Sequence, residues 1–323
     1  MIDSPRISVA LCTYNGERFI AQQIESILAQ SMPVDEIVLG DDASSDNTVQ
    51  IVEELVGRTN IDLMVRRHNP GLGVRGNFAD AISATTGDVI ILCDQDDVWH
   101  RDKVEKLVEA LGDKELVHSD ARLVDAEGNP KGSALLEELN VSAWEKRNLV
   151  DGDALAVLLK RNLVTGATAA VKGEFARSIM PVPDGWIHDE WLAFIAAFDR
   201  QLVLLPEALT DYRQHENNQI GAKKEPLSVQ IKRKISADSD DDARRLTRAI
   251  SAFHFVASTN RGLEEDRERL ERAVKHQQAR SLMPKGHFSR IPALMGEASK
   301  GNYSKYSRGI WAFGRDLLRS FDS

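Results

Sequence analysis

Three aspartates lie within four residues directly after an apolar run, and this arrangement can bind a divalent cation. The run Val89–Cys93 reads as a strand buried on both faces of a sheet, and it leads into Asp94, Asp96 and Asp97. Carboxylates this close repel one another unless a cation lies between them. Mg²⁺ and Mn²⁺ suit such a site, because they bind one or two carboxylates and complete their shell with water and substrate phosphate. The alternative is a solvated turn that caps the following helix.

Asp189 and His215 are two further candidates for chemistry. Asp189 follows a Pro-Gly turn and is flanked by Trp186 and Trp191. Partial burial would raise its pKa and make it a better proton acceptor. The alternative places it at a helix N-terminus, where it stabilises the helix dipole. His215 can serve as an imidazole metal ligand, although a lone histidine is more often structural.

Four apolar segments, separated by helical patterns, must position these residues. We expect strands at Ile7–Cys12, Ile37–Gly40, Ile61–Arg66 and Val89–Cys93, and helices at Glu17–Gln30, from a cap at Ser44 or Ser45 to Val56, and at Phe78–Thr85. This alternation predicts a doubly wound, mostly parallel sheet. Right-handed crossovers bring the strand ends to one edge, so one site can draw on Thr13–Asn15, Asp41–Asp42 and Asp94–Asp97.

The remainder of the chain has weaker patterns. We expect helices at Lys103–Leu111 and Ala154–Leu159, strands at Leu116–Val124, Gly166–Val171 and Leu202–Leu205, a loop over Glu127–Val150, a rigid turn at Pro181–Gly185, an exposed linker at Arg233–Arg245 and a long polar helix or helix pair at Ala243–Gln278.

Composition narrows the class of protein. The chain has 323 residues, of which 42% are hydrophobic and 28% charged, as in ordinary globular proteins. A net charge of -9 argues against a nucleic-acid binder. The N-terminus lacks the pattern of a signal peptide, and no apolar run approaches the roughly 18–20 residues of a membrane span. Cys12 and Cys93 read as reduced packing residues, so we expect a cytoplasmic, soluble or peripherally attached protein.

The segment Gly71–Gly76 fits the G-x-G-x-x-G pattern of dinucleotide-binding proteins. That fingerprint requires the glycines to leave a strand directly and open a helix. Here His68, Asn69 and Pro70 intervene. A nicotinamide or flavin enzyme is therefore an outside possibility.

As an ordered set, several segments resemble a known family. They are SVALCTYNGERFIAQQIESILAQ, IVLGDDASSDNT, NPGLGVRGNFADAI, GDVIILCDQDDVW, HDEWL and YRQHENN, and they cover roughly Ile7–Gly221. They resemble family 2 glycosyltransferases of the GT-A fold, in the bacterial rhamnosyltransferase-like subgroup. KGNYSKYSRGIWAFGRDLLR also resembles that subgroup's carboxyl-terminal tail. The resemblance implies an α/β Rossmann-like sheet flanked by helices, with a catalytic domain over 1–221 (a nucleotide-sugar half to about 100 and an acceptor half beyond it) and a helical region over 222–323.

The resemblance also implies roles for individual residues. A nucleotide pocket would be formed by Thr13, Tyr14 and Asn15, with Asp41 or Asp42 recognising the base and Asn69, Gly71 and Asn77 shaping its wall. Asp94 and Asp96 occupy the D-x-D positions, and Asp96 or Asp97 would hold Mn²⁺ or Mg²⁺, with His215 as a further metal ligand. Asp189 would be the catalytic base. His188 stands where the family more often has glutamate, and its role is left open.

Together with the resemblance, these residues predict a metal-dependent inverting glycosyltransferase. It would move a sugar from a nucleoside-diphosphate donor (dTDP-rhamnose or a UDP-sugar) to a hydroxyl of a glycan or lipid-linked acceptor in bacterial surface polysaccharide synthesis. The metal would stabilise the departing diphosphate, and the carboxylate would deprotonate the acceptor. One alternative is a sugar-phosphate nucleotidyltransferase, but such an enzyme would have a Gly-rich phosphate loop after the first strand, and this chain does not. Another is a non-catalytic protein that binds a nucleotide sugar or a glycan.

The segment Lys285–Ser323 is basic and aromatic on an acidic chain. It has seven Lys or Arg and three acidic residues, interleaved with residues such as Tyr303, Trp311 and Phe313. This pattern predicts peripheral contact with the anionic inner face of a membrane. The alternative is a helix that packs its apolar stripe on the catalytic domain.

Overall fold

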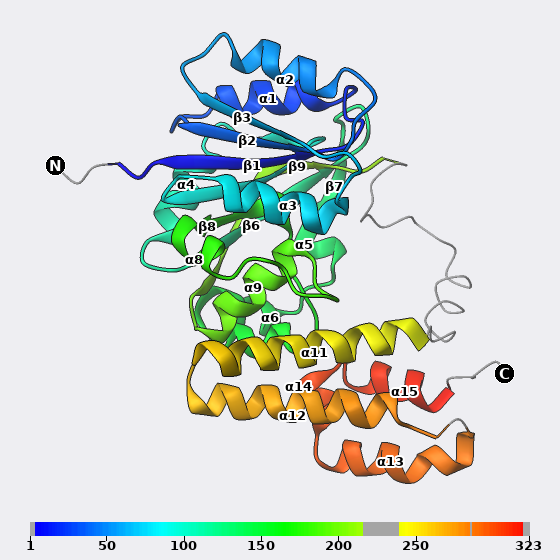
Figure 1. Ribbon diagram of the computed structural model, residues 1–323. Coiled ribbons are helices and arrows are strands. Elements are labelled where there is room, and N and C mark those ends of the chain that lie inside the picture. The colour runs from blue at the N-terminus through cyan, green and yellow to red at the C-terminus, as the bar shows by residue number, and fades with distance from the viewer. Residues whose placement is uncertain (1–3, 216–238, 285, 319–323) are drawn as a thin grey trace.

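The computed structural model describes residues 4–215, 239–284 and 286–318, and one mixed sheet organises the first two thirds of the chain (Figure 1). In the described residues the strand order is β3-β2-β1-β4-β8-β6-β9-β5, with β7 beside β6. The strands are β1 (Ile7–Thr13), β2 (Glu36–Asp41), β3 (Asp62–Arg67), β4 (Val89–Asp94), β5 (Val98–Trp99), β6 (Leu116–Val124), β7 (Pro130–Ala134), β8 (Ala169–Lys172) and β9 (Leu202–Arg213).

The amino-terminal half of the sheet is parallel, as the alternating pattern predicts. β1 pairs in parallel with β2 and β4, and β2 pairs in parallel with β3. One face packs on α1 (Ile20–Leu28), α2 (Thr48–Val56) and α4 (Lys103–Leu111), and the other packs on α3 (Gly73–Ala84). Because both faces are covered, every residue of β1 and β2 is buried. This two-sided burial explains why these strands read as continuous apolar runs.

The second half of the sheet is mixed, so the sheet as a whole is less parallel than its first half. β8 runs antiparallel to both β4 and β6, whereas β6 and β9 are parallel. The predicted strand Gly166–Val171 begins with a 3-10 turn, η1 (Gly166–Thr168), before β8. The predicted short strand Leu202–Leu205 is only the start of β9, which is 12 residues long and ends at Arg213. Its extension carries the chain to the acidic residues after β4.

Three local predictions were wrong: the loop at Glu127–Val150, the start of helix α3 and the cap of helix α2. Glu127–Val150 is not a loop: it contains β7, α5 (Leu135–Glu138) and α6 (Ala143–Asp151). β7 is largely exposed and α6 buries only Leu149, so neither has the apolar period that the prediction required. Helix α3 begins at Gly73, five residues before the predicted Phe78, because the carboxylate of Asp42 accepts hydrogen bonds from Leu72 N and Gly73 N.

Ser44 and Ser45 do not cap helix α2, which begins at Thr48. Asn15 N donates to Ser44 Oγ at 2.9 Å, and Ser45 N donates to Asn15 Oδ1 at 2.8 Å. Both serines therefore join the end of β1 to the loop after β2 and are not available to start a helix.

The buried helix α9 (His188–Phe198) lies between the sheet and a carboxyl-terminal helical region (Figure 1). The predicted helix pair is present as α11 (Ser239–Thr259) and α12 (Glu264–Ser281). The predicted linker Arg233–Arg245 falls partly outside the described residues, and its described part belongs to α11. Ala252, Val256 and Leu270 of this pair share a hydrophobic core with α9. The smaller helices α7 (Ala154–Leu158) and α8 (Gly173–Ser178) complete this layer.

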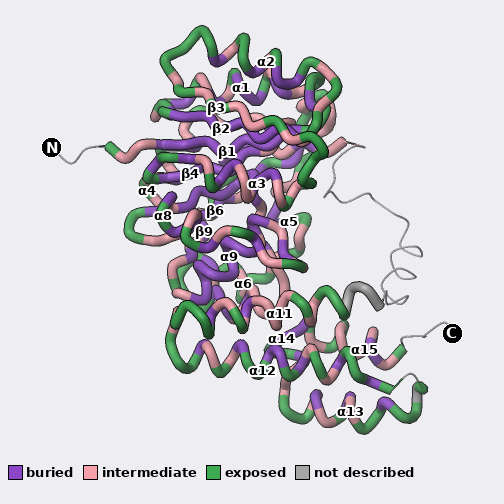
Figure 2. The backbone as a smooth tube through the Cα atoms, in the orientation of Figure 1, coloured by how far each residue is buried: buried purple, intermediate pink, exposed green. Residues whose placement is uncertain are grey.

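The last helices, α13 (His287–Ser299), α14 (Asn302–Tyr306) and α15 (Ile310–Leu318), pack on α12 and on one another. Their small core contains Met283, Leu294 and Tyr303. The tail therefore packs on the helical region and not on the sheet. Figure 2 shows buried residues gathered along the sheet and α9, while the outer surfaces of α12 and α13 are exposed. No helix in the described residues is both long and apolar enough to cross a membrane.

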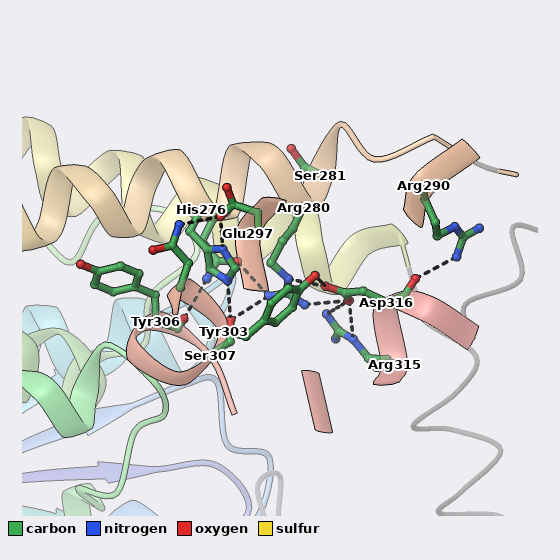
Figure 3. A network of polar contacts seen from close by, with 12 residues as sticks. His276, Arg280, Ser281, Arg290, Glu297, Tyr303, Tyr306, Ser307, Arg315 and Asp316 are labelled. Carbon is green, nitrogen blue, oxygen red and sulfur yellow. Dashed lines mark hydrogen bonds and ion pairs between the residues drawn. The ribbon is translucent and has the colours of Figure 1, made fainter. Parts of the chain in front are cut away.

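A buried ion pair fastens α15 to α12 (Figure 3). Arg280 donates from Nε and Nη2 to the two carboxylate oxygens of Asp316 at 2.6 and 2.9 Å, and Tyr303 Oη donates to the same carboxylate at 3.0 Å. Asp316 is 3% exposed and Arg280 also 3%. His276 Nδ1 lies 2.7 Å from Glu297 Oε2 and extends the network to α13. Removing one partner would take away the ion pair that offsets the cost of burying the other charge.

We therefore expect Asp316→Asn to destabilise the helical region by about 3–5 kcal/mol. Urea unfolding and limited proteolysis of the full chain would measure this. The matched control is Glu268→Gln, which removes an exposed pair with Arg272 and should leave the midpoint unchanged. Equal midpoints for Asp316→Asn and the wild type would show that the buried pair does not stabilise this region.

Candidate active site

The predicted edge of polar strand ends is present in the structure. In the register of the sheet, Thr13 at the end of β1 pairs with Asp41 at the end of β2, and Cys12 pairs with Asp94 at the end of β4. The carboxyl ends of three parallel strands therefore meet side by side, at the edge where open α/β sheets bind ligands. Cys12 and Cys93 are buried free thiols just behind this edge.

The acidic residues after β4 are crowded and poorly solvated. Burial and the charge of Asp96 raise the pKa of Asp94 to about 7. Burial, Asp96 and Asp94 together raise the pKa of Asp97 well above its usual value. Asp97 is 2% exposed, and within the described part of the chain its Oδ2 has no hydrogen-bond partner. Such a group costs free energy unless a cation or a proton compensates it.

His215 reaches the same acidic residues from the end of β9. Its Nε2 lies 2.8 Å from Asp96 Oδ2, and its ring stacks on Phe19 with the centroids 4.8 Å apart. The structure thus brings together three of the predicted metal ligands, Asp96, Asp97 and His215. The described residues contain no group of three His, Cys, Asp or Glu already arranged to hold a metal ion.

This donor set fits a Mg²⁺ or Mn²⁺ ion that is bound together with its substrate. Such ions are usually held by one or two carboxylates plus substrate phosphates, and not by dedicated cages made of protein alone. The carboxylate oxygen of Asp97 that lacks a partner and the raised pKa values are what such a site would show without its cation.

Arg213 holds β9 against the acidic residues, and the sequence analysis did not single it out. Its backbone N donates to Asp97 Oδ1 at 2.9 Å, and its Nε donates to Asp96 O at 2.7 Å. Its Nη2 donates to Gln22 Oε1 at 2.6 Å, and its guanidinium lies 4.9 Å from the centroid of the Phe19 ring. Arg213 therefore sets the position of His215, two residues farther on. In the sequence, Arg213 stood out only as part of the segment YRQHENN, which contributes to the family resemblance.

Lys103 is a second residue that sequence reasoning missed. Its Nζ donates to Ala167 O at 2.6 Å and Thr210 Oγ1 at 2.9 Å, and it lies 4.2 Å from the centroid of the Trp99 ring. Burial lowers the pKa of Lys103 to about 8, while the charges of Asp97 and Asp94 act in the opposite direction. A lysine at the start of an amphipathic helix is usually exposed, so nothing in the sequence marked it as buried beside the acidic residues.

Asp189 lies in the first turn of α9 and faces the same site. Its Oδ2 accepts a hydrogen bond from Gly166 N at 3.0 Å, and its Oδ1 accepts one from Glu190 N at 2.7 Å. Burial raises the pKa of Asp189 to about 6 despite these bonds. Its charge in turn contributes to the raised pKa of Asp94, so the two carboxylates are close enough to interact. Asp189 is therefore a buried carboxylate at a helix N-terminus, which are the two features that its sequence interpretations invoke.

His188, whose role the sequence left open, packs against α3. Its ring stacks on Phe78 with centroids 3.7 Å apart, and in the described residues neither ring nitrogen has a hydrogen-bond partner. Burial lowers the pKa of His188 to about 3, so the imidazole is neutral. Its visible contribution is the apolar contact that seats α9 on α3.

Two of the residues expected at the nucleotide pocket, Asp41 and Asn69, line a groove beside β2. This groove is lined by Asp41, Ala43, Ser44, Asp46, Asn47, Val49, Gln50, Arg67, His68 and Asn69. Asp41 accepts hydrogen bonds from Thr13 Oγ1 and Ser44 N, both at 3.0 Å. Tyr14 is 50% exposed above the end of β1. The predicted residues Asp41 and Asn69 therefore share one hollow.

Three other predicted wall residues make internal contacts. Asp42 binds the backbone at the start of α3, and Gly71 lies against its carboxylate, where an added Cβ would come within 2.9 Å of Asp42 Oδ1. Asn77 is buried, and its Nδ2 donates to Gly40 O at 2.8 Å. Asn77 therefore supports β2 from below and does not line the groove.

The pKa of Asp189 has a consequence for stability that can be measured. Because the folded-state pKa of about 6 lies above the usual 3.8, its contribution to stability is fully present below pH 3.8 and is lost as the pH rises through 6. Asp189→Asn removes this dependence. We therefore expect the free energy of unfolding of the wild type, relative to that of Asp189→Asn, to fall by roughly 1–1.5 kcal/mol between pH 5 and pH 8.

Urea unfolding at a series of pH values would measure this difference. Asp184→Asn, an exposed carboxylate in the preceding turn, serves as the control and should show no such dependence. A pH-independent difference between the wild type and Asp189→Asn would contradict the burial argument.

Comparison with known proteins identifies relatives of this chain in sequence and in fold. Residues 8–163 match the sequence model of glycosyl transferase family 2. The dTDP-rhamnosyl transferase RfbG of Shigella flexneri is 29% identical over 237 residues, which is 66% of this chain and 74% of that protein. Matches to the first curated relatives span 59–67% of those proteins' length.

Two solved structures share the fold across nearly the whole chain. The S. aureus protein TarS (residues 1–349), in complex with UDP-GlcNAc, has a TM-score of 0.60 at 16% identity and covers 97% of this chain and 88% of that one. The mannosyltransferase PcManGT from Pyrobaculum calidifontis, in complex with GDP-Man and Mn²⁺, has a TM-score of 0.55 at 19% identity, with 98% and 81% covered. Residues 8–163 therefore resemble glycosyltransferase family 2 in sequence, and the chain has the GT-A fold of these glycosyltransferases.

Proposed function

We propose that this protein is a metal-dependent inverting glycosyltransferase that transfers a sugar from a nucleoside-diphosphate donor to a hydroxyl group of a glycan or lipid-linked acceptor. One observation carries the proposal: at one edge of the sheet, a buried carboxylate with a raised pKa, Asp189, interacts with the acidic residues that end β4. Sugar transfer needs a base for the acceptor and a cationic site for the leaving diphosphate.

The metal would be Mn²⁺ or Mg²⁺, held by Asp96, Asp97 and His215. When bound, it would stabilise the negative charge on the departing diphosphate as a Lewis acid. The chain supplies the ligands and fixes their positions: Arg213 binds Asp96 O and Asp97 Oδ1, and Phe19 supports the ring of His215. The Mn²⁺ present with GDP-Man in the Pyrobaculum mannosyltransferase is consistent with this assignment.

Asp189 would act as the general base for the acceptor hydroxyl. Two backbone N–H groups orient its carboxylate, and burial raises its proton affinity toward neutral pH, where base catalysis is most effective. A base on the face of the sugar opposite the leaving group implies in-line displacement and inversion at the anomeric carbon.

The donor would lie across the ends of β1, β2 and β4. Thr13, Tyr14 and Asn15 would contact the nucleotide, with Asp41 and Asn69 at the base and Asp94 at the sugar-phosphate. The contacts of Asp42, Gly71 and Asn77 give them supporting roles in the same wall. The name of the Shigella relative favours dTDP-rhamnose, and the TarS complex favours a UDP-sugar. Synthesis of a bacterial surface polysaccharide is the setting that this donor class suits.

We also propose that residues 1–221 form a catalytic domain and that residues 222–323 form a helical region. The described strands all lie between residues 7 and 213, and from residue 239 the described elements are helices. The core shared by α9, α11 and α12 would keep the two parts together.

The first test is hydrolysis of the donor. Purified protein with dTDP-rhamnose or a UDP-sugar and Mn²⁺ should release the nucleoside diphosphate, and Asp189→Ala should lower this rate by about 10²–10⁴-fold through loss of the base. The wild-type rate should rise with pH through about 6, as Asp189 ionises. Asp184→Asn is the control. Saturable donor binding without any release of nucleoside diphosphate would identify a non-catalytic binding protein instead.

The second test addresses the metal ligands directly. Titration of Mn²⁺ in the presence of UDP or dTDP, followed by electron paramagnetic resonance, should show a dissociation constant at least about tenfold higher in Asp96→Asn and in His215→Ala than in the wild type. His254→Ala, an exposed histidine on α11, should bind Mn²⁺ like the wild type. Unchanged affinity in both ligand variants would remove the metal assignment.

A further inference from the structure

The last helices expose large apolar side chains that their packing does not explain. Seven of the thirteen large apolar side chains that are exposed in the described residues fall between Leu282 and Leu318. They include Phe288 at 88%, Ile310 at 81% and Trp311 at 82% exposed. Isolated exposed apolar residues are normal on a protein surface, but a concentration of them marks an interaction site.

On α13 these residues form one stripe. Phe288, Ile291 and Met295 are spaced three and four residues apart, which places them on the same face of the helix. An adjacent side of the helix is already used, because Leu294 packs with Met283 and Tyr303 in the small core. On helix α15, Phe313 and Leu317 contact that core, whereas Trp311 and Leu318, which are seven residues apart and share another face, are exposed. Each helix thus has an inner apolar face and a second one that no described residue covers.

The charges on this surface have one sign. Between residues 286 and 318 the only acidic residues are Glu297 and Asp316, which are 7% and 3% exposed and are held by His276 and Arg280 respectively. Lys300, Lys305 and Arg308 are exposed. The surface of α13–α15 therefore presents apolar and basic groups without an exposed carboxylate, on a chain whose net charge is -9.

The combination favours a lipid surface over other anionic partners. A nucleic acid would be bound mainly through a dense array of basic residues, and three exposed ones do not supply it. Amphipathic helices that lie in a membrane interface have basic residues beside Trp, Phe and Leu, whose apolar parts enter the boundary between headgroups and acyl chains. Basic residues near them are attracted to anionic lipids.

We propose that the outer face of α13 and α15 docks on an anionic lipid bilayer, with Phe288, Ile291, Met295, Trp311 and Leu318 inserted at the interface and Lys300 and Lys305 against the headgroups. In Figure 1, α13 lies at the end of the molecule opposite α1 and α2, so the bilayer would meet the helical region and leave the sheet edge clear. The inference goes beyond sugar transfer, although it would suit a lipid-linked acceptor.

Co-sedimentation of the full chain with vesicles, without any nucleotide sugar, tests this. Vesicles of phosphatidylcholine with 30% phosphatidylglycerol should bind the wild type. The double variant Phe288→Ser, Trp311→Ser should bind them at least about tenfold more weakly. Lys305→Glu should also weaken binding to these vesicles. Because the side chains of Phe288, Trp311 and Lys305 are exposed, the thermal midpoints of both variants should match that of the wild type.

The control variant is Trp144→Ser with Leu263→Ser, two exposed apolar residues outside this surface, which should bind like the wild type. Absence of wild-type binding, or equal binding to pure phosphatidylcholine, would overturn the proposal. Self-association of the wild type without lipid, abolished by the Phe288, Trp311 variant, would assign the surface to a second copy and also overturn it. Neither result would affect donor hydrolysis, so the two proposals fail separately.

Discussion

The structure depends on the crowding of three aspartates at the end of a fully buried strand. β4 passes through the centre of the sheet with its first five residues buried, and Asp94, Asp96 and Asp97 follow where solvent is scarce. Burial and mutual repulsion raise the pKa of Asp94 and of Asp97. Ionised carboxylates in such a setting are tolerated when positive charge and hydrogen bonds compensate them. Much of the surrounding structure supplies that compensation.

Three elements converge on these aspartates. Arg213 ends β9 and His215 follows two residues later, the start of α4 brings the ammonium of Lys103, and Phe19 before α1 contacts both Arg213 and His215. The buried ammonium of Lys103 lies close enough for its charge to act on Asp94 and Asp97, and in the described residues Asp97 Oδ2 still has no hydrogen-bond partner. Asp189, whose carboxylate accepts a hydrogen bond from Gly166 N, is the residue that would accept a proton in the proposed reaction.

The parts of this site that come from local sequence could be predicted. Continuous apolar runs identified β1, β2 and β4, and the rule for parallel strands put Thr13, Asp41 and Asp94 at one edge. Asp189 was identified from its place after a Pro-Gly turn between two tryptophans. Arg213 and Lys103 could not be found in this way, because their roles depend on contacts with residues far away in the chain. The same applies to the extension of β9, whose exposed middle, Pro206 and Glu207, breaks the apolar pattern.

The central claim is that the acidic end of β4 holds a divalent cation together with a nucleoside diphosphate. The most direct measurement is a crystal structure of the protein with Mn²⁺ and UDP or dTDP, with the anomalous signal of manganese locating the ion. We expect manganese to be bound by Asp96 or Asp97 and by His215, with the diphosphate completing the coordination shell of the metal. Asp189 should face the position of the sugar. A diphosphate bound at the strand ends without manganese, or manganese bound elsewhere, would contradict it.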